Sequence, residues 1–197
     1  MNPITLDFGP QTRIVARLAE GVRDDRLADP TPCPQYAVRH LLGHLLGLAV
    51  AFRDAGRKDL GVTTDTGPQS ALPDIGPGWR EELPKVLDEL AEVWREPAAW
   101  TGMTRAGGFD MPGEVTAAVA VDELVVHGWD LARATGQAYV PDPAALAASH
   151  AFLRAAAEES ERGDGIFGPV VPVPSDAPLL DRTIGLSGRD PGWTRPA

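Results

Sequence analysis

The sequence is poor in cysteine and contains no long apolar run, and each shortage excludes a class of structure. A single cysteine among 197 residues, Cys33, excludes an internal disulfide and fits the reducing cytosol. The apolar runs are short and interrupted, which excludes a segment that spans a bilayer. The first residues also lack the basic start and apolar core of a signal peptide. We therefore expect a cytoplasmic protein without a membrane partner.

Acidic residues outnumber basic ones, and this balance limits the partners that we expect. The formal net charge is -10 at pH 7, which disfavours binding to nucleic acid and to anionic membranes. Lys58 and Lys85 are the only lysines among 18 basic residues, and with the heavy use of alanine this indicates a GC-rich bacterial genome. A length of 197 residues with 43% apolar and 23% charged residues predicts one globular domain over residues 1–197.

Apolar spacing predicts an all-α protein built on a four-helix bundle. Residues recur at helical spacing in four segments: 9–28, 37–55, 79–95 and 113–134. Glycine and proline mark 56–78 as a long loop, and residues 100–110 as irregular or a short extended turn. A fifth helix is expected at 143–161. An extended Pro/Gly-rich tail follows, in which 179–193 can form one more short helix closed by Gly188.

One apolar stretch, residues 117–132, carries the clearest chemical signal. Glu123 and His127 lie four residues apart in it, so they share one face of a helix that should be buried. A buried carboxylate is costly unless it is paired, hydrogen-bonded or bound to a metal. His44, in the apolar helix around 38–50, can supply a third ligand. Two histidines and one carboxylate from two packed helices leave one tetrahedral position open, as catalytic zinc sites do.

Each of these residues also has an ordinary structural interpretation. A lone histidine on an apolar helix, such as His44, is usually a core residue with satisfied hydrogen bonds. Glu123 and His127 could form only a surface contact worth a few tenths of a kcal/mol, although their apolar neighbours argue against exposure to solvent. Spacing and burial alone leave the metal site and the structural role equally open.

Three stretches together resemble the DinB/YfiT-like metal-binding superfamily. Pro30-Thr-Pro-Cys-Pro-Gln-Tyr-Ala-Val-Arg-His-Leu-Leu-Gly-His44 is similar to the motif that enters its second helix. Asp122-Glu-Leu-Val-Val-His-Gly-Trp-Asp-Leu-Ala-Arg-Ala-Thr-Gly136 is similar to its fourth-helix motif. Leu180-Asp-Arg-Thr-Ile-Gly-Leu-Ser-Gly-Arg-Asp-Pro-Gly-Trp193 resembles the tail of an actinobacterial branch, which is similar to the N-terminal domain of mycothiol-dependent maleylpyruvate isomerase.

The resemblance implies a DinB-like bundle in which His44, Glu123 and His127 bind the metal. Two positions depart from the family motif: Tyr36 stands where tryptophan is usual, and His40 where aspartate is usual. His40 forms a competing His-x-x-x-His pair with His44, and we expect it to be exposed or to cap the helix. The isomerase also has a C-terminal domain that supplies catalytic groups. We do not expect this chain to contain it, so isomerisation of maleylpyruvate itself does not follow.

We expect four further residues to support the structure rather than to bind the metal. Cys33 has no lysine near it in sequence to favour a reactive thiolate, so we expect a buried structural thiol. Asp130 can accept a hydrogen bond from a metal-binding imidazole, or form an ion pair with Arg133 or a neighbouring helix. Arg189 and Asp190 are expected to hold the C-terminal tail by ion pairs.

The resemblance implies an enzyme of the thiol S-transferase or isomerase type. A divalent metal, zinc first and nickel as the alternative, would activate a low-molecular-weight thiol for attack on a small electrophile. The thiol implied is mycothiol. A non-catalytic metal-binding module and a hydrolase that uses a metal-bound hydroxide are the alternatives. The sequence leaves open the electrophile, and whether the protein is a monomer or a homodimer.

Overall fold

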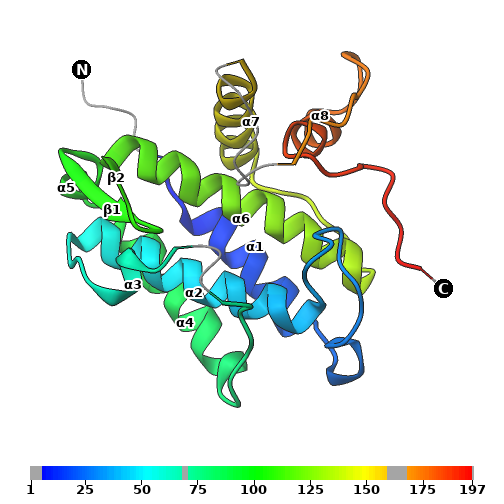
Figure 1. The fold of residues 1–197 in the computed structure, drawn as a ribbon, viewed down its shortest axis with the longest axis horizontal. Helices are drawn as coiled ribbons and strands as arrows, with labels where there is room; N and C mark the ends of the chain where they lie inside the picture. Colours follow the sequence, from blue (N-terminus) through cyan, green and yellow to red (C-terminus); the bar gives the residue numbers. More distant parts are fainter. Residues whose placement is uncertain (1–5, 68–70, 159–167, 197) are drawn as a thin grey trace.

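The computed structural model describes residues 6–67, 71–158 and 168–196, in which the regular elements are helices and one short hairpin (Figure 1). The bundle consists of α1 (Gly9–Glu20), α2 (Val38–Arg57), α4 (Trp79–Val93) and α6 (Gly113–Thr135). The other elements are short or follow the bundle: a 3-10 turn (Asp24–Arg26), α3 (Val62–Asp65), α5 (Pro97–Trp100), β1 (Met103–Ala106), β2 (Phe109–Pro112), α7 (Pro143–Glu158) and α8 (Leu179–Leu186). The predicted all-α fold built on a four-helix bundle is confirmed.

The bundle core is built from leucines spaced three and four residues apart, which places them on one face of each helix. In the bundle, α4 packs between α1 and α2, and α6 contacts both α1 and α2 from the other side. The innermost leucines are fully buried: Leu41, Leu42 and Leu45 of α2, Leu83, Leu87 and Leu90 of α4, and Leu124 and Leu131 of α6. Each such side chain stabilises the fold by roughly 1.5–3 kcal/mol relative to an exposed one.

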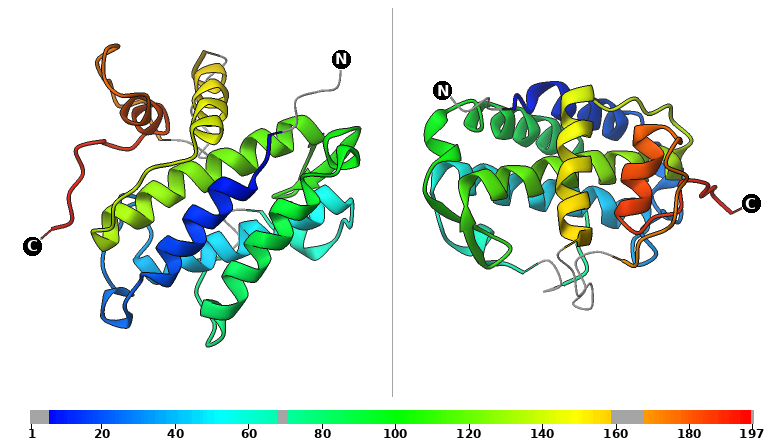
Figure 2. Two further views of the ribbon diagram at one scale, coloured as in Figure 1. Left: turned by 180° about the vertical axis from the view of Figure 1, so that it is seen from behind. Right: turned by 90° about the horizontal axis from the view of Figure 1, so that it is seen from above.

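Helix α6 differs from the other bundle helices because it is buried nearly all round. Its inner face packs on α1 and α2, and α7 crosses its outer face (Figure 2). It ends where predicted, since Gly136 adopts the left-handed conformation with φ of 72°. The apolar run that predicted this helix therefore reflects contacts on both of its faces.

The first helix is shorter than predicted. Helical spacing continued to residue 28, but α1 ends at Glu20. The Gln137 side chain lies against Gly21, and its amide donates to the carbonyl of Leu18 at 2.9 Å. Val22, beyond the end of α1, is nevertheless buried. Val22 thus reaches the core from a turn, although its spacing in the sequence assigned it to the helix.

A β-hairpin occupies part of the segment predicted to be irregular or a short extended turn. Strands β1 and β2 pair antiparallel, with Met103 opposite Pro112 and Ala106 opposite Phe109. Gly107 and Gly108 form the turn with φ values of 61° and 82°. Two consecutive positive φ angles are required by the tightest hairpin turns. The adjacent glycines were the local signal for this hairpin.

The C-terminal appendage packs on the outside of the bundle. Helix α7 contacts α6 and α8, and the tail after α8 runs on as extended chain (Figures 1 and 2). The fifth helix was expected at 143–161, of which residues 159–161 lie outside the described residues. Helix α8 ends at Leu186, and Gly188, which was predicted to close this helix, follows with φ of 86°. None of the described helices is long and apolar enough for a membrane span.

Gly43 and Gly47 lie one turn apart on α2 and give a matched test of the packing. A Cβ at Gly43 would lie 2.6 Å from the carbonyl carbon of Asp74, whereas a Cβ at Gly47 would meet nothing within 4 Å. We expect Gly43→Ala to lower the free energy of unfolding by about 1–3 kcal/mol, because the loop backbone must move. Gly47→Ala should raise it by up to about 1 kcal/mol, because alanine favours helix. Urea denaturation tests both, and an unchanged Gly43→Ala protein would contradict the close approach.

Candidate metal centre

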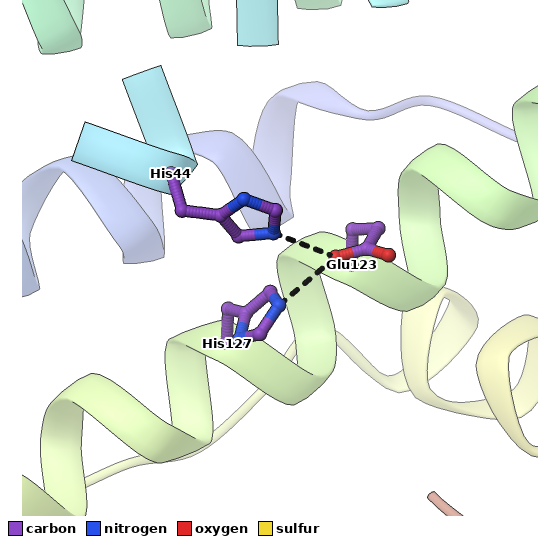
Figure 3. A group of neighbouring side chains, drawn as sticks. All are labelled: His44, Glu123 and His127. Carbon is purple, nitrogen blue, oxygen red and sulfur yellow. Dashed lines mark ion pairs between the residues drawn. The ribbon is translucent and has the colours of Figure 1, made fainter. Parts of the chain in front are cut away.

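Helices α2 and α6 pack so that His44 faces Glu123 and His127 (Figure 3). Glu123 Oε2 lies 3.5 Å from His44 Nε2 and 3.0 Å from His127 Nε2. One donor atom from each residue lies within 4.8 Å of the other two. The structure therefore brings together the three residues selected from the sequence. Their role as metal ligands remains a prediction.

The spacing of these donor atoms can be compared with that of a metal site. In a tetrahedral zinc site, with bonds to nitrogen and oxygen of about 2.1 Å, ligand atoms lie about 3.4 Å apart. The distances from Glu123 Oε2, 3.5 and 3.0 Å, are close to that value. The rings of His44 and His127 are nearly perpendicular with centroids 4.8 Å apart. The donor types suit a divalent metal, and the two distances from Glu123 Oε2 are close to those of a zinc site.

The centre is buried on one side and accessible on the other. The His127 side chain is only 8% exposed, whereas those of His44 and Glu123 are 19% and 23% exposed. The Tyr36 ring lies beside His44, with ring centroids 5.4 Å apart. Solvent can therefore reach the side formed by His44 and Glu123. Such access distinguishes an open site from a closed structural one.

The second ring nitrogen of His127 is held by a buried carboxylate. His127 Nδ1 lies 2.9 Å from Asp130 Oδ2, and the Asp130 side chain is fully buried. This partner places a hydrogen on Nδ1 and directs Nε2 towards Glu123. Asp130 also forms an ion pair, but with Arg189 of the tail at 3.0 Å. Arg133, the partner considered from sequence, instead donates to the carbonyl of Pro191.

Hydrogen bonds set the charge of the metal-free centre. Burial alone would lower the pKa of His127, but its hydrogen bonds to Asp130 and Glu123 outweigh burial and raise the pKa to about 9. Burial alone would raise the pKa of Glu123, but hydrogen bonds from His127 and His44 hold it well below the usual value. The metal-free centre is thus a carboxylate beside an imidazolium at neutral pH. A divalent metal would take the place of the imidazolium proton.

The remaining candidates from the sequence are accounted for by local contacts. His40 Nδ1 accepts a hydrogen bond from the Ala37 backbone N–H at 3.2 Å, which is the capping role predicted for it. Cys33 is half-buried, and burial together with the nearby Asp130 carboxylate raises the pKa of its thiol. A thiol with a raised pKa is a weak nucleophile, consistent with a structural role. Asp190 accepts from the Gly192 backbone N–H at 2.8 Å, closing a turn of the tail.

Sequence reasoning missed the polar role of Asp122. Its side chain is buried, and it accepts a hydrogen bond of 2.6 Å from Ser149 Oγ on α7. Burial raises the pKa of Asp122 to about 7. The signal was present as an acidic residue inside an apolar run next to Glu123. The partner was not visible, because Ser149 lies 27 residues away on another helix.

Comparison with known proteins identifies the family. Residues 8–132 match the family model described as the mycothiol maleylpyruvate isomerase N-terminal domain. The chain belongs to this family. The match confirms the resemblance seen in the sequence motifs. It includes all three residues of the candidate centre, whereas α7, α8 and the tail lie outside the matched range.

Individual relatives extend this comparison. Two uncharacterized proteins of Mycobacterium tuberculosis are similar: MT0763 of strain CDC 1551 / Oshkosh and Rv0738 of strain ATCC 25618 / H37Rv. Each is 27% identical over 194 residues, which cover 96% of this chain and 98% of the relative. Two crystal structures of mycothiol-dependent maleylpyruvate isomerase, one of a histidine-to-alanine mutant, match with a TM-score of 0.49 and 17% and 16% identity. These matches cover 74% of this chain and 66% of the isomerase, just under two thirds of its length.

We expect the chain to bind one divalent metal after incubation with zinc or nickel. His44→Ala and His127→Ala should each weaken binding by more than about a hundredfold, beyond the usual effect of partners outside the ligand set. His40→Ala should retain most of the affinity, because His40 caps a helix. Elemental analysis and chelator competition measure both quantities. If His40→Ala loses the metal and His44→Ala does not, the ligand from α2 is His40, one helical turn before His44.

Binding should also depend on pH. His127 carries a proton below its pKa of about 9, and this proton must leave before Nε2 can bind a metal. Apparent zinc affinity should therefore rise with pH, by about tenfold per pH unit between about pH 6 and 8 for each proton released. Competition titrations at several pH values give this slope. An affinity that does not change over this range would contradict protonation of His127 in the metal-free protein.

Proposed function

We propose that the protein is a divalent-metal-dependent enzyme that activates a low-molecular-weight thiol for attack on a small electrophile. The observation that carries this proposal is the three-residue centre of His44, Glu123 and His127, which is reachable from solvent on one side. Two imidazoles and one carboxylate favour zinc, and nickel is also compatible with imidazole ligands. With three protein ligands, a tetrahedral metal would keep its fourth coordination position for an exchangeable molecule.

The charges of the surrounding residues support an anionic occupant of that position. Glu123 contributes one negative charge at the centre, while the charges of Asp130 and Arg189 cancel each other as an ion pair. A divalent cation held by this set would therefore carry a net charge of about +1, which a single anion neutralises. When bound, such a metal supplies Lewis acidity, which lowers the pKa of a nearby thiol and favours the thiolate. A thiolate is the nucleophilic form of a thiol.

The choice of mycothiol rests on the family. The matching family model is described by mycothiol and maleylpyruvate isomerase, and the similar solved structures are of a mycothiol-dependent enzyme. We therefore propose mycothiol as the thiol substrate of this chain. A small-molecule thiol is also consistent with a cytoplasmic location. The electrophile is left to experiment, because the family motif concerns only the metal-binding helices.

A thiol-dependent reaction separates this function from hydrolysis and from metal storage. Zinc-loaded protein is incubated with mycothiol and a chlorodinitrobenzene, so that the sulfur–carbon bond forms, chloride leaves and the thiol proton passes to buffer. We expect the absorbance of the thioether product to increase with time, and its slope gives the reaction rate. This rate should fall by more than about a hundredfold in His127→Ala, because the loss of a direct ligand exceeds the usual effect of its outer partners.

The control variant is His40→Ala, which should retain the rate because the hydrogen bond of His40 is to the start of its own helix. Glutathione and cysteine serve as comparison thiols. The melting temperature of the zinc-loaded protein is measured with each thiol as well. If the protein binds zinc but no thiol raises its melting temperature or is turned over, it is a metal-binding module. Ester hydrolysis that needs zinc but no thiol would instead identify a hydrolase.

A further inference from the structure

The tail that follows α8 is held on the bundle by three arginine contacts. Arg189 pairs with Asp130 of α6, with Nη2 3.0 Å and Nε 3.3 Å from Oδ2. Arg133 of α6 donates to the carbonyl of Pro191 at 2.9 Å. Arg195 Nη1 lies 2.9 Å from Asp29 Oδ2. Of these three, only the contact of Arg189 reaches a residue that is bonded to the candidate metal centre.

A continuous chain of hydrogen bonds leads from the tail to that centre. Asp130 Oδ2 accepts from Arg189 Nη2 at 3.0 Å and lies 2.9 Å from His127 Nδ1. His127 Nε2 in turn lies 3.0 Å from Glu123 Oε2. The guanidinium is itself held in place, because Arg189 Nη1 donates to the carbonyl of Ser187 at 3.2 Å. In this series of hydrogen bonds, Ser187 therefore holds Arg189, Arg189 holds Asp130, and Asp130 holds the ring of His127.

Burial makes the orientation of Asp130 depend on these partners. The Asp130 side chain has no exposed surface, and that of Arg189 is only 15% exposed. A buried carboxylate has no bulk water to accept from, so it stays where its donors are. Removal of one partner of a buried ion pair is strongly unfavourable, because the remaining charge is left uncompensated. Asp130 could not keep its present position beside His127 without Arg189.

We propose that Arg189 is a positioning residue of the metal centre, acting through Asp130 on the ring of His127. Docking of the C-terminal tail and metal binding are therefore coupled. The coupling is reciprocal, since a tail that improves metal affinity is itself held more firmly when metal binds. This inference rests on the proposed function in one respect, the binding of a metal by His44, Glu123 and His127. It assigns a role in that site to a segment outside the family match, which ends at residue 132.

The charge of Arg189 acts against this effect and must be weighed. A nearby cation by itself repels a metal ion, so removal of Arg189 could strengthen binding. The bonded Asp130 carboxylate, however, cancels that charge at close range. Partners of metal-binding histidines contribute about 10- to 100-fold to metal affinity through orientation and ligand basicity. We expect the loss of orientation in an Arg189 variant to outweigh the removal of its charge.

The test compares zinc affinities of two tail variants by chelator competition. Arg189→Gln should weaken zinc binding by at least about tenfold. Arg195→Gln is the matched control, because it removes a partly exposed ion pair of the same tail that does not contact Asp130. Its affinity should stay within about twofold of wild type, as such pairs contribute little. If Arg189→Gln does not fold, Arg189→Lys replaces it, which keeps the charge but loses the two-pronged contact and should also weaken binding.

A second measurement reads the tail directly. Backbone N–H groups of the tail are hydrogen-bonded, among them Arg189 to Ile184 and Trp193 to Asp190. Zinc should slow hydrogen exchange at these amides in wild type and not in Arg189→Gln. An unchanged zinc affinity in a folded Arg189 variant, or tail exchange that zinc leaves unaltered in wild type, would overturn the coupling. A wild-type protein that binds no zinc would instead refute the proposed metal site.

Discussion

Helix α6 is buried on both faces, and each of its buried carboxylates needs a partner on another part of the chain. The partners come from three different elements: Asp122 bonds to Ser149 of α7, Glu123 to His44 of α2, and Asp130 to Arg189 of the tail. The same helix thus fixes the position of a bundle neighbour, of the crossing helix and of the C-terminal segment. A buried carboxylate without a partner would destabilise the fold by more than a surface contact stabilises it. The arrangement around α6 follows from that requirement.

The candidate metal centre is one of these three pairings, and it differs from the others in being open to solvent. Asp122 and Asp130 are buried and have protein partners, whereas the Glu123 side chain remains 23% exposed beside two histidines. In the metal-free protein an imidazolium proton balances its charge. In the function proposed here, a divalent cation would take the place of that proton, since both histidines already lie near Glu123.

The part of the structure that sequence predicted best is the part governed by local spacing. Glu123 and His127 share a helix face because they lie four residues apart, and Gly136 ends that helix because it accepts a positive φ. His44 was found because it is polar in an apolar helix. The end of α1 was predicted wrongly, since Val22 follows the helical pattern although the Leu18 carbonyl accepts from the Gln137 side chain and the Val22 N–H donates to Ala19 instead. The hairpin was missed because its strands are only four residues long.

The sequence by itself determined the helical bundle, the absence of disulfides and the identity of the three residues at the centre. It did so because these depend on side-chain type and on spacing within one helix. Only the tertiary structure decided which face of α2 meets α6, and that Arg189 rather than Arg133 pairs with Asp130. Asp130 and Arg189 are 59 residues apart, and their contact depends on how the tail returns over α6. No local pattern encodes such a contact, because its energy is gained only once both segments are already folded and buried.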